Sequence, residues 1–252
     1  RLPPHSLSIT FDDGYKNFFL EAYPIIKARE VPVTIFLTTN FVCRRVPLWT
    51  DRLEYAHSLI YTDRLEVGKK TDHNRRTQLK LVSDCDKEVQ VAQIERAAKA
   101  GLRDFAGPRA VYAPLDIEDI RQMDTAPEHL IAFGPHTQSH PILTQVNLSQ
   151  AREEIRGSKI EVKAMAKNFS NVMSYPNGQP TDWDDNIESI SREEGFLAAV
   201  TTIPGPVRTS DNLFALRRFT MDQTNHWPLF LATSSGLRAA LQSIKRKYGP
   251  SR

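Results

Sequence analysis

The chain has 252 residues, of which 40% are hydrophobic and 25% are charged, an ordinary composition for a globular protein. This length suits one α/β barrel, so we expect a single domain over residues 1–252. The net charge of +3 is too small to favour nucleic acid or an anionic membrane as a partner. No stretch approaches the roughly 20 apolar residues that span a bilayer. The oligomeric state is not indicated.

The two cysteines and the beginning of the chain bear on its redox state and processing. Cys43 and Cys85 are too few for a disulfide scaffold, and their spacing does not fit a zinc knuckle, so we expect two free thiols. No signal peptide is evident. The chain starts at Arg1 rather than at Met, which is typical of a trimmed or processed form.

The first elements predict a βαβ unit. Leu7, Ile9 and Phe11 alternate with polar residues, which indicates a short strand. A helix is expected over residues 16–29, and the apolar run at residues 31–37 is typical of a parallel strand covered on both faces.

Residues 43–128 differ from the rest of the chain. They are rich in charge and contain one clear helix, over residues 87–100, that ends at Gly101. We interpret this segment as a helical insertion on the barrel rather than as a second domain. A lid, a partner surface and a dimer contact are all open roles for it.

The regular alternation of strands and helices resumes after this segment. Strands are expected at 130–133, 172–175, 196–201 and 214–221, and helices at 147–166, 181–195 and 228–247. Asn147 is the expected N-cap of the first of these helices, and Thr181 of the second. Polar clusters follow the ends of successive strands, where α/β sheets and barrels place their chemistry.

Two adjacent carboxylates, Asp12 and Asp13, stand at the end of the first expected strand. Such a pair repels unless a cation or a proton relieves it. The turn at Gly14 can bring both side chains to one opening. The alternative is a helix N-cap followed by a solvated acid.

His136 and His140 form the second polar cluster. The i, i+4 spacing places both imidazoles on one side of a helical turn, as in metal sites with two histidines. Thr137 and Ser139 are small polar neighbours that could orient an imidazole through its second nitrogen. The alternative is two surface histidines on a loop. One carboxylate and two histidines leave positions open on a metal, which is a catalytic arrangement, and the second carboxylate is then a natural general base.

Four motifs in order carry a resemblance to a known family. The run TFDDG at residues 10–14 resembles the first signature of the NodB-type polysaccharide deacetylases, carbohydrate esterase family 4, and HTQSH at 136–140 resembles their histidine signature. SYPNG at 174–178 is similar to their third motif, and the pair DW at 182–183 to their fourth. The resemblance implies a hydrolase that deacetylates a glycan, and a distorted (β/α) barrel with about seven strands. It favours a cell envelope or secreted setting and leaves a cytoplasmic one open.

The resemblance also assigns roles around a metal. Asp13, His136 and His140 would bind one divalent ion, with zinc as the first choice and cobalt or nickel also acceptable to this ligand set. Asp12 would be the general base that deprotonates a metal-bound water.

The same resemblance assigns the substrate groove. The backbone N–H of Asn177 would complete an oxyanion site, and Tyr175 and Trp183 would line the sugar groove. These assignments rest on the third and fourth motifs.

Two positions depart from the family pattern. Ser174 stands where many members have an arginine that orients the base aspartate. Residues 216–219 lack the histidine of the family's Leu-x-His motif, which protonates the leaving amine. Arg217 or Arg218 is a candidate for the missing positive charge and for substrate binding, although arginine is a poor proton donor. His226 is the candidate acid, with a surface histidine beside the last helix as its alternative.

Three functions are therefore compared. The leading one is deacetylation of an N-acetylated or O-acetylated glycan. The second is an ester or amide hydrolase of the same fold acting on acetylated xylan or a small molecule. The third is a metal-binding or carbohydrate-binding relative without turnover.

Overall fold

Parallel strands run through the part of the chain that the computed structural model describes, residues 6–61, 73–99, 111–125, 130–221, 227–235 and 237. The strands are β1 (Ile9–Phe11), β2 (Val33–Leu37), β3 (Ile131–Pro135), β4 (Val172–Ser174) and β5 (Ala198–Val200). The α-helices are α1 (Tyr23–Arg29), α2 (Thr39–Arg44), α3 (Trp49–Ile60), α5 (Asp84–Ala98), α6 (Ile117–Asp124), α7 (Leu148–Met165), α8 (Asp185–Glu193) and α9 (Trp227–Ser234). The shorter turns are η1 (Phe18–Ala22), η3 (Leu143–Gln145) and η4 (Leu213–Ala215), and residues 73–79 are also helical.

The strands form two parallel sheets. One has the order β1-β2-β3 and the other pairs β4 with β5. A bridge between Phe133 and Phe169 links the sheets, and a second bridge joins Val200 to Leu216. Strand, helix, strand alternation therefore confirms the α/β class.

The strand count is lower than the sequence suggested. We expected about seven strands in a distorted barrel, and five lie in the described residues. The expected strand at 214–221 is reduced to the bridge at Leu216. Its start is wound into η4, where the side chain of Asn212 accepts a hydrogen bond from the N–H of Phe214.

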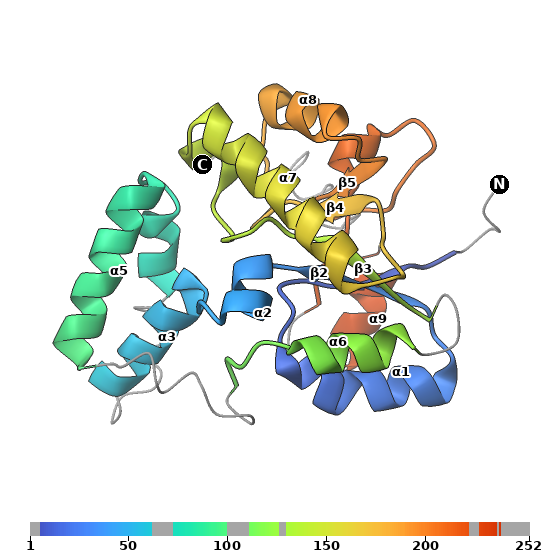
Figure 1. The fold of residues 1–252 in the computed structure, drawn as a ribbon, viewed down its shortest axis with the longest axis horizontal. Coiled ribbons are helices and arrows are strands. Elements are labelled where there is room, and N and C mark those ends of the chain that lie inside the picture. Colours follow the sequence, from blue (N-terminus) through green and yellow to red (C-terminus); the bar gives the residue numbers. More distant parts are fainter. Residues whose placement is uncertain are drawn as a thin grey trace.

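Helices cover both sheets, and α7 is shared between them (Figure 1). Ile120 and Met123 of α6 and Val162 of α7 pack against the three-stranded sheet together with α1. Ala151 and Ile155 of α7 pack instead with α8 and the two-stranded sheet. The apolar residues of α7 thus recur along one buried face, as in an amphipathic helix.

A pair of helices stands beside this α/β core, at the left of Figure 1. Trp49 and Leu53 of α3 and Val91 of α5 form a small cluster with Leu79. α5 begins at Asp84 because Ser83 caps it, and it ends at Ala98, before the left-handed Lys99. Gly101, the expected stop, lies outside the described residues. Helix α6 falls within the expected insertion at 43–128 but packs in the main core.

Several expected boundaries are confirmed and one is wrong. Asn147 caps α7 by accepting a hydrogen bond from the N–H of Gln150, as expected. The N-cap of α8 is Asp184 rather than Thr181, because the extended backbone of Asp184 lets its carboxylate accept from the N–H of Ile187. The helix expected over 16–29 begins with the π-helical η1. The helix expected over 228–247 is described as α9, and its later residues lie outside the described ranges.

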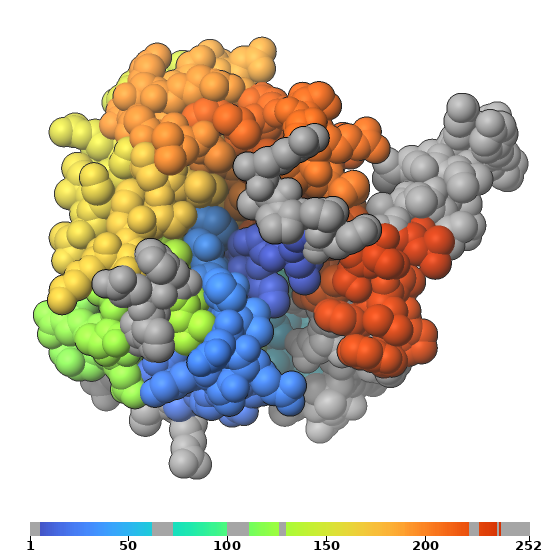
Figure 2. All heavy atoms as spheres, turned by 90° about the vertical axis from the view of Figure 1, so that its right-hand side faces the viewer, coloured from blue at the N-terminus to red at the C-terminus, as the bar shows by residue number. Residues whose placement is uncertain are grey.

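Surface features complete the fold. Cys43 and Cys85 are free and exposed, as expected. Within the described ranges, no helix has the length and apolar character needed to cross a membrane. Figure 2 shows dark-blue residues from the beginning of the chain recessed between orange segments of the C-terminal half and α9 in red.

Candidate active site

The polar residues predicted from sequence meet at the carboxyl ends of the parallel strands. Asp12 and Asp13 follow β1, His136 follows β3, and Ser174 ends β4. The N–H of His136 donates to the carbonyl of Leu37 at 2.9 Å, so the β3 loop is tied to the end of β2. This is the edge at which parallel α/β sheets place their sites.

Three side chains form a candidate metal centre. Oδ1 of Asp13 lies 3.5 Å from Nε2 of His136 and 3.5 Å from Nε2 of His140. The two imidazoles meet edge to face, with ring centroids 4.8 Å apart. One ligand atom from each residue lies within 4.8 Å of the others. The arrangement brings together the carboxylate and the two histidines predicted from sequence.

The backbone turn after β1 aims Asp13 into this cluster. Asp13 has a φ of 72° and Gly14 a φ of 92°. A Cβ at Gly14 would approach the side chains of Leu37 and Val42 to 2.9 Å, so both the conformation and the space require glycine. The strand alternation of β1 is thereby broken, and the two adjacent carboxylates reach the same opening.

The two histidines converge through a loop and not through the expected helical turn. Thr137 and His140 have positive φ values of 64° and 60°, which interrupt any helical path. The hydroxyl of Thr137 accepts the N–H of His140 at 3.1 Å. The i, i+4 spacing gave the correct pair for a different geometric reason.

Glu154 of α7 binds the loop between His136 and His140. Its Oε2 accepts the backbone N–H groups of Gln138 and Ser139, each at 2.8 Å, and its Oε1 accepts the hydroxyl of Ser139 at 2.5 Å. The residue is buried, with 7% exposure. Burial raises the pKa of Glu154 against the opposing effect of these hydrogen bonds. The carboxylate fixes the spacing of the two histidines.

The second nitrogen of His136 is fixed by backbone. Nδ1 lies 2.7 Å from the carbonyl oxygen of Ser174, so Nδ1–H donates and Nε2 is left to face Asp13. We expected Thr137 or Ser139 to orient an imidazole. Their hydroxyls are committed to His140 N–H and to Glu154, so this expectation was wrong.

The charge distribution at the cluster suits a cation. Burial and the nearby charges of Asp12 and Asp51 raise the pKa of Asp13 well above its usual value. Burial lowers the pKa of both imidazoles, which keeps them neutral as ligands. Oδ1 of Asp13 is buried and has no hydrogen-bond partner among the described residues. An orphaned carboxylate oxygen facing two imidazole nitrogens fits the open donor set of a divalent metal ion.

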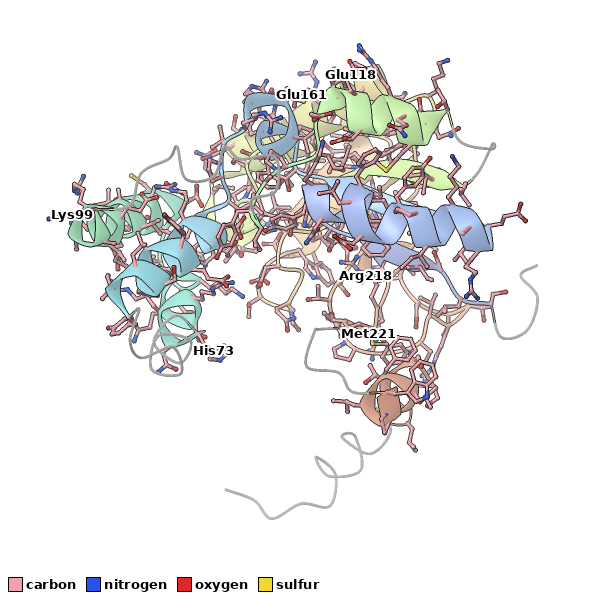
Figure 3. The ribbon with its side chains drawn as sticks, turned by 90° about the horizontal axis from the view of Figure 1, so that it is seen from below. His73, Lys99, Glu118, Glu161, Arg218 and Met221 are labelled. Atoms are coloured by element: carbon pink, nitrogen blue, oxygen red, sulfur yellow. The ribbon has the colours of Figure 1, made fainter. Side chains whose placement is uncertain are left out.

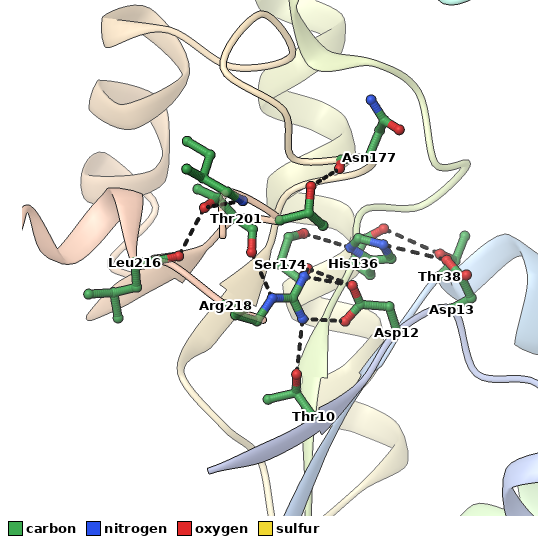
Figure 4. Close-up of polar contacts among 12 residues, drawn as sticks. Thr10, Asp12, Asp13, Thr38, His136, Ser174, Asn177, Thr201, Leu216 and Arg218 are labelled. Carbon is green, nitrogen blue, oxygen red and sulfur yellow. Dashed lines mark hydrogen bonds and ion pairs between the residues drawn. The ribbon is translucent and has the colours of Figure 1, made fainter. Parts of the chain in front are cut away.

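The second carboxylate is held by Arg218 (Figure 4). Nη1 and Nη2 of Arg218 donate to the two carboxylate oxygens of Asp12 at 2.8 and 2.7 Å, and the hydroxyl of Ser174 donates to Oδ2 at 3.2 Å. Burial alone would raise the pKa of Asp12, but the neighbouring His136 ring and the charge and hydrogen bonds of Arg218 hold it below its usual value. Asp12 is therefore an ionised carboxylate with a fixed orientation.

Arg218 is itself fixed by three further acceptors. Nε donates to the carbonyl of Thr201 at 2.8 Å, Nη1 to the hydroxyl of Thr10 at 3.0 Å and Nη2 to the hydroxyl of Ser174 at 2.9 Å. The side chain thus crosses from the segment after Leu216 back to β1. Ser174 replaces the arginine of the third motif, and Arg218 supplies the positive charge from elsewhere in the chain.

Of the two candidate arginines, only Arg218 reaches Asp12 among the described contacts. Arg217 is exposed, and its side chain lies beside Gly205. Side chains of neighbouring residues in an extended segment point to opposite sides, which explains why Arg218 faces Asp12 and Arg217 does not.

The third motif divides into a buried and a half-buried part. Tyr175 is fully buried in the core and stacks on Trp183, with centroids 5.4 Å apart and an angle of 10° between the rings. Tyr175 therefore packs the core and does not form a groove wall in this structure. Trp183 is partly buried in the same cluster. Asn177 is half-buried at a φ of 59°, beside this core. His226 lies outside the described residues.

Sequence reasoning missed several residues around the site, and only Glu154 left a signal. Glu154 stands on the apolar face of α7, where a charge is unusual. The hydroxyl of Tyr15 donates to both oxygens of buried Asp51 at 2.9 Å. Lys80 donates to the side chain of Asn177. Asp51 and Lys80 come from a charged segment that offered no periodic pattern linking them to the strands.

The order of the motifs, the candidate metal centre and the fold agree with one family. The model of the family described as "Polysaccharide deacetylase" matches residues 1–114 and 116–199. The chain belongs to the polysaccharide deacetylase family. The resemblance inferred from four motifs is thus confirmed.

One curated relative shows low sequence identity to this chain. YxkH of Bacillus subtilis (strain 168), whose name places it among polysaccharide deacetylases, is 21% identical over 210 residues, or 83% of this chain and 49% of YxkH. The chain therefore spans about half the length of that relative.

Solved structures show the same fold at low identity. The deacetylase PplD of Streptococcus pyogenes, solved in complex with acetate, is 18% identical, with a TM-score of 0.58 over 93% of this chain and 73% of PplD. IcaB of Ammonifex degensii is 16% identical, with a TM-score of 0.59 over 93% of this chain and 75% of IcaB. These similarities support the α/β fold of the family.

Proposed function

We propose that the chain is a metal-dependent hydrolase that removes the acetyl group from an N-acetylated or O-acetylated glycan. The observation that carries the proposal is the placement of Asp12. Its carboxylate is ionised and is bound by Nη1 and Nη2 of Arg218, beside the cluster of Asp13, His136 and His140. A base and a metal donor set thus stand side by side at the carboxyl ends of the strands.

The chemistry divides between the ion and the protein. Asp13, His136 and His140 would hold the ion, with zinc as the first choice. When bound, a divalent ion supplies Lewis-acid polarisation of an acyl carbonyl and lowers the pKa of a coordinated water. Asp12 would take the proton from the attacking water, because Arg218 keeps its carboxylate charged and fixes its orientation.

The remaining steps fall to backbone and to a proton donor. The N–H of Asn177 would stabilise the negative oxygen that develops on the acyl carbon. Arg218 does not lose its proton readily, so it orients the base and does not protonate the leaving amine. His226 is proposed as that donor on its sequence position alone.

The domain organisation is part of the same proposal. We propose one NodB-type domain over the whole chain, in which the described strands form part of a distorted barrel and a helical insertion begins at about residue 43. The separate apolar cluster of α3 and α5 supports the insertion. The packing of α6 in the main core suggests that the insertion ends before α6.

The test is acetate release from an N-acetylglucosamine oligomer by the zinc-loaded protein. We expect release that is reduced at least 100-fold in Asp12→Asn, since a general base contributes about 10²–10⁴-fold. Release from acetylated xylan alone would favour the second function considered from sequence. Tight zinc binding with no turnover of any acyl substrate would contradict the enzyme proposal.

A further inference from the structure

A contact crosses from the segment between α3 and α5 to the loop of the third motif, residues 174–178. Lys80 follows the helical residues 73–79, and its Nζ donates to Oδ1 of Asn177, which is 97 positions away in the chain. Lys80 is half-buried, so this contact is shielded from solvent. No contact of this kind was evident from sequence.

The side chain of Asn177 is held at both ends. Its Oδ1 accepts from Lys80, and its Nδ2 donates to Oδ2 of Asp182. Asp182 is buried, with 4% exposure, and the same oxygen accepts the N–H of Gln179 at 2.7 Å. A chain of hydrogen bonds therefore runs from the cation of Lys80 through Asn177 to a buried carboxylate.

The backbone of Asn177 is held as well. Its carbonyl accepts the hydroxyl of Thr202 at 2.6 Å, and its φ of 59° is a left-handed conformation that asparagine tolerates better than most residues. Among the described residues, the backbone N–H is the one polar group of Asn177 without a partner. The surrounding contacts thus fix the direction of that N–H.

The helical pair has a second attachment near the site. Tyr15, two residues after Asp13, donates its hydroxyl to both oxygens of Asp51 on α3, each at 2.9 Å. Asp51 is buried, and the ring of Tyr15 packs edge to face on Phe41. This contact anchors α3 to the loop that carries Asp13, and Leu79, the neighbour of Lys80, packs in one cluster with Leu53 of α3.

We propose that Lys80 is a positioning residue for deacetylation, which acts by holding the side chain of Asn177 so that the Asn177 N–H faces the developing oxyanion. This inference rests on the proposed function. It gives the helical segment a role in the reaction beyond that of a lid or a partner surface.

The first test separates kcat from KM. In Lys80→Met we expect kcat on an N-acetylglucosamine oligomer to fall about tenfold, part of the 10²–10³-fold effect of losing an oxyanion donor, with KM changed less than twofold. Lys80→Arg keeps a donor and should stay within threefold of the wild type. The control is Lys99→Met, an exposed lysine at the outer end of α5, far from Arg218 in Figure 3, which should change neither constant.

The second test is a double-mutant cycle. Asn177→Gly removes the side chain and accepts the left-handed backbone, so it isolates the contact with Lys80. If Lys80 acts through Asn177, adding Lys80→Met to Asn177→Gly should lower kcat less than twofold further. Multiplying effects of the two substitutions would overturn the proposal, as would an unchanged kcat in Lys80→Met.

A third measurement is independent of activity. Hydrogen exchange of peptides covering residues 172–183 in the metal-free protein should be faster in Lys80→Met than in the wild type, and unchanged in Lys99→Met. Equal exchange in Lys80→Met and wild type would refute the positioning role. If the zinc-loaded wild type releases no acetate from any substrate, the proposed function fails, and the exchange result still decides whether Lys80 fixes the Asn177 loop.

Discussion

Arg218 binds Asp12 through two nitrogens, at 2.8 and 2.7 Å, across 206 positions of sequence. This pair combines a bidentate geometry with partial burial, at 16% exposure for the arginine side chain and 25% for the carboxylate. It ties the segment after β5 to the end of β1 and fixes the orientation of the Asp12 carboxylate, which we propose as the base. The pair is therefore the first target for mutation.

Replacing Arg218 should impair catalysis more than folding of the remaining site. In Arg218→Met we expect kcat/KM to fall about 100-fold, because Asp12 loses the partner that orients its carboxylate and keeps its pKa low. The measurement is acetate release from an N-acetylglucosamine oligomer. Arg208→Met, at an exposed arginine, is the matched control and should stay within twofold of the wild type. Equal activity in Arg218→Met and wild type would show that Asp12 does not need this partner.

Glu154 offers a test of the loop that carries the histidines. Glu154→Gln replaces a carboxylate that accepts two backbone N–H groups and one hydroxyl. We expect zinc affinity to fall about tenfold, as for other groups that orient metal ligands, and the free energy of unfolding to fall by about 1–2 kcal/mol.

The matched control for this variant is Glu153→Gln, at the exposed neighbouring position on α7. Zinc titration and urea unfolding should place it with the wild type. Wild-type zinc affinity in Glu154→Gln would mean that the histidine loop holds its geometry without the carboxylate.

The buried acid Asp51 predicts a pH dependence of stability. Burial raises its pKa from an ordinary value of 3.8 to about 7, despite the hydrogen bond from Tyr15. Between these values the folded state binds a proton that the unfolded state has lost, so stability falls as pH rises from about 4 to 7 and levels off above 7. Below about pH 4 both states are protonated, and the penalty disappears.

Asp51→Asn removes this titration. Urea unfolding of the metal-free protein at pH 5.0 and 7.5 should show a loss of stability with rising pH that is smaller in Asp51→Asn than in the wild type by about 2 kcal/mol, the contribution of this one carboxyl group. Asp185→Asn, at an exposed acid on α8, is the control and should retain the loss. The same loss in Asp51→Asn would locate the pH dependence elsewhere.

The sequence predicted the centre of the site better than its surroundings. Asp12, Asp13, His136 and His140 were identified because their spacing and strand-end positions are local properties of the chain. The turn at Gly14 and the strand register then bring them together. The expectation of a helical turn at the histidines was wrong because Thr137 and His140 adopt left-handed backbone conformations. Their residue types do not predict these conformations.

Long-range contacts limited the rest of the prediction. Arg218 was one of two candidates, and the direction of its side chain depends on the bridge at Leu216, which a strand pattern does not specify. Tyr175 was expected in a groove because it is aromatic and follows a strand, yet it points into the core beneath Trp183. Lys80 reaches Asn177 only because α3 and α5 pack beside the site, and no local pattern indicates this packing.

The proposed metal-dependent deacetylation is tested most directly by a zinc titration. Protein freed of metal with a chelator is titrated with zinc, and acetate release from an N-acetylglucosamine oligomer is measured at each step. We predict that release rises linearly to about one zinc per chain, in line with the single cluster of Asp13, His136 and His140 in the described residues, and then stays level. His140→Ala should release no acetate at one equivalent. Two results would contradict the account. One is full acetate release by wild-type protein from which a chelator has removed the metal, and the other is release by His140→Ala at the wild-type rate with one equivalent of zinc.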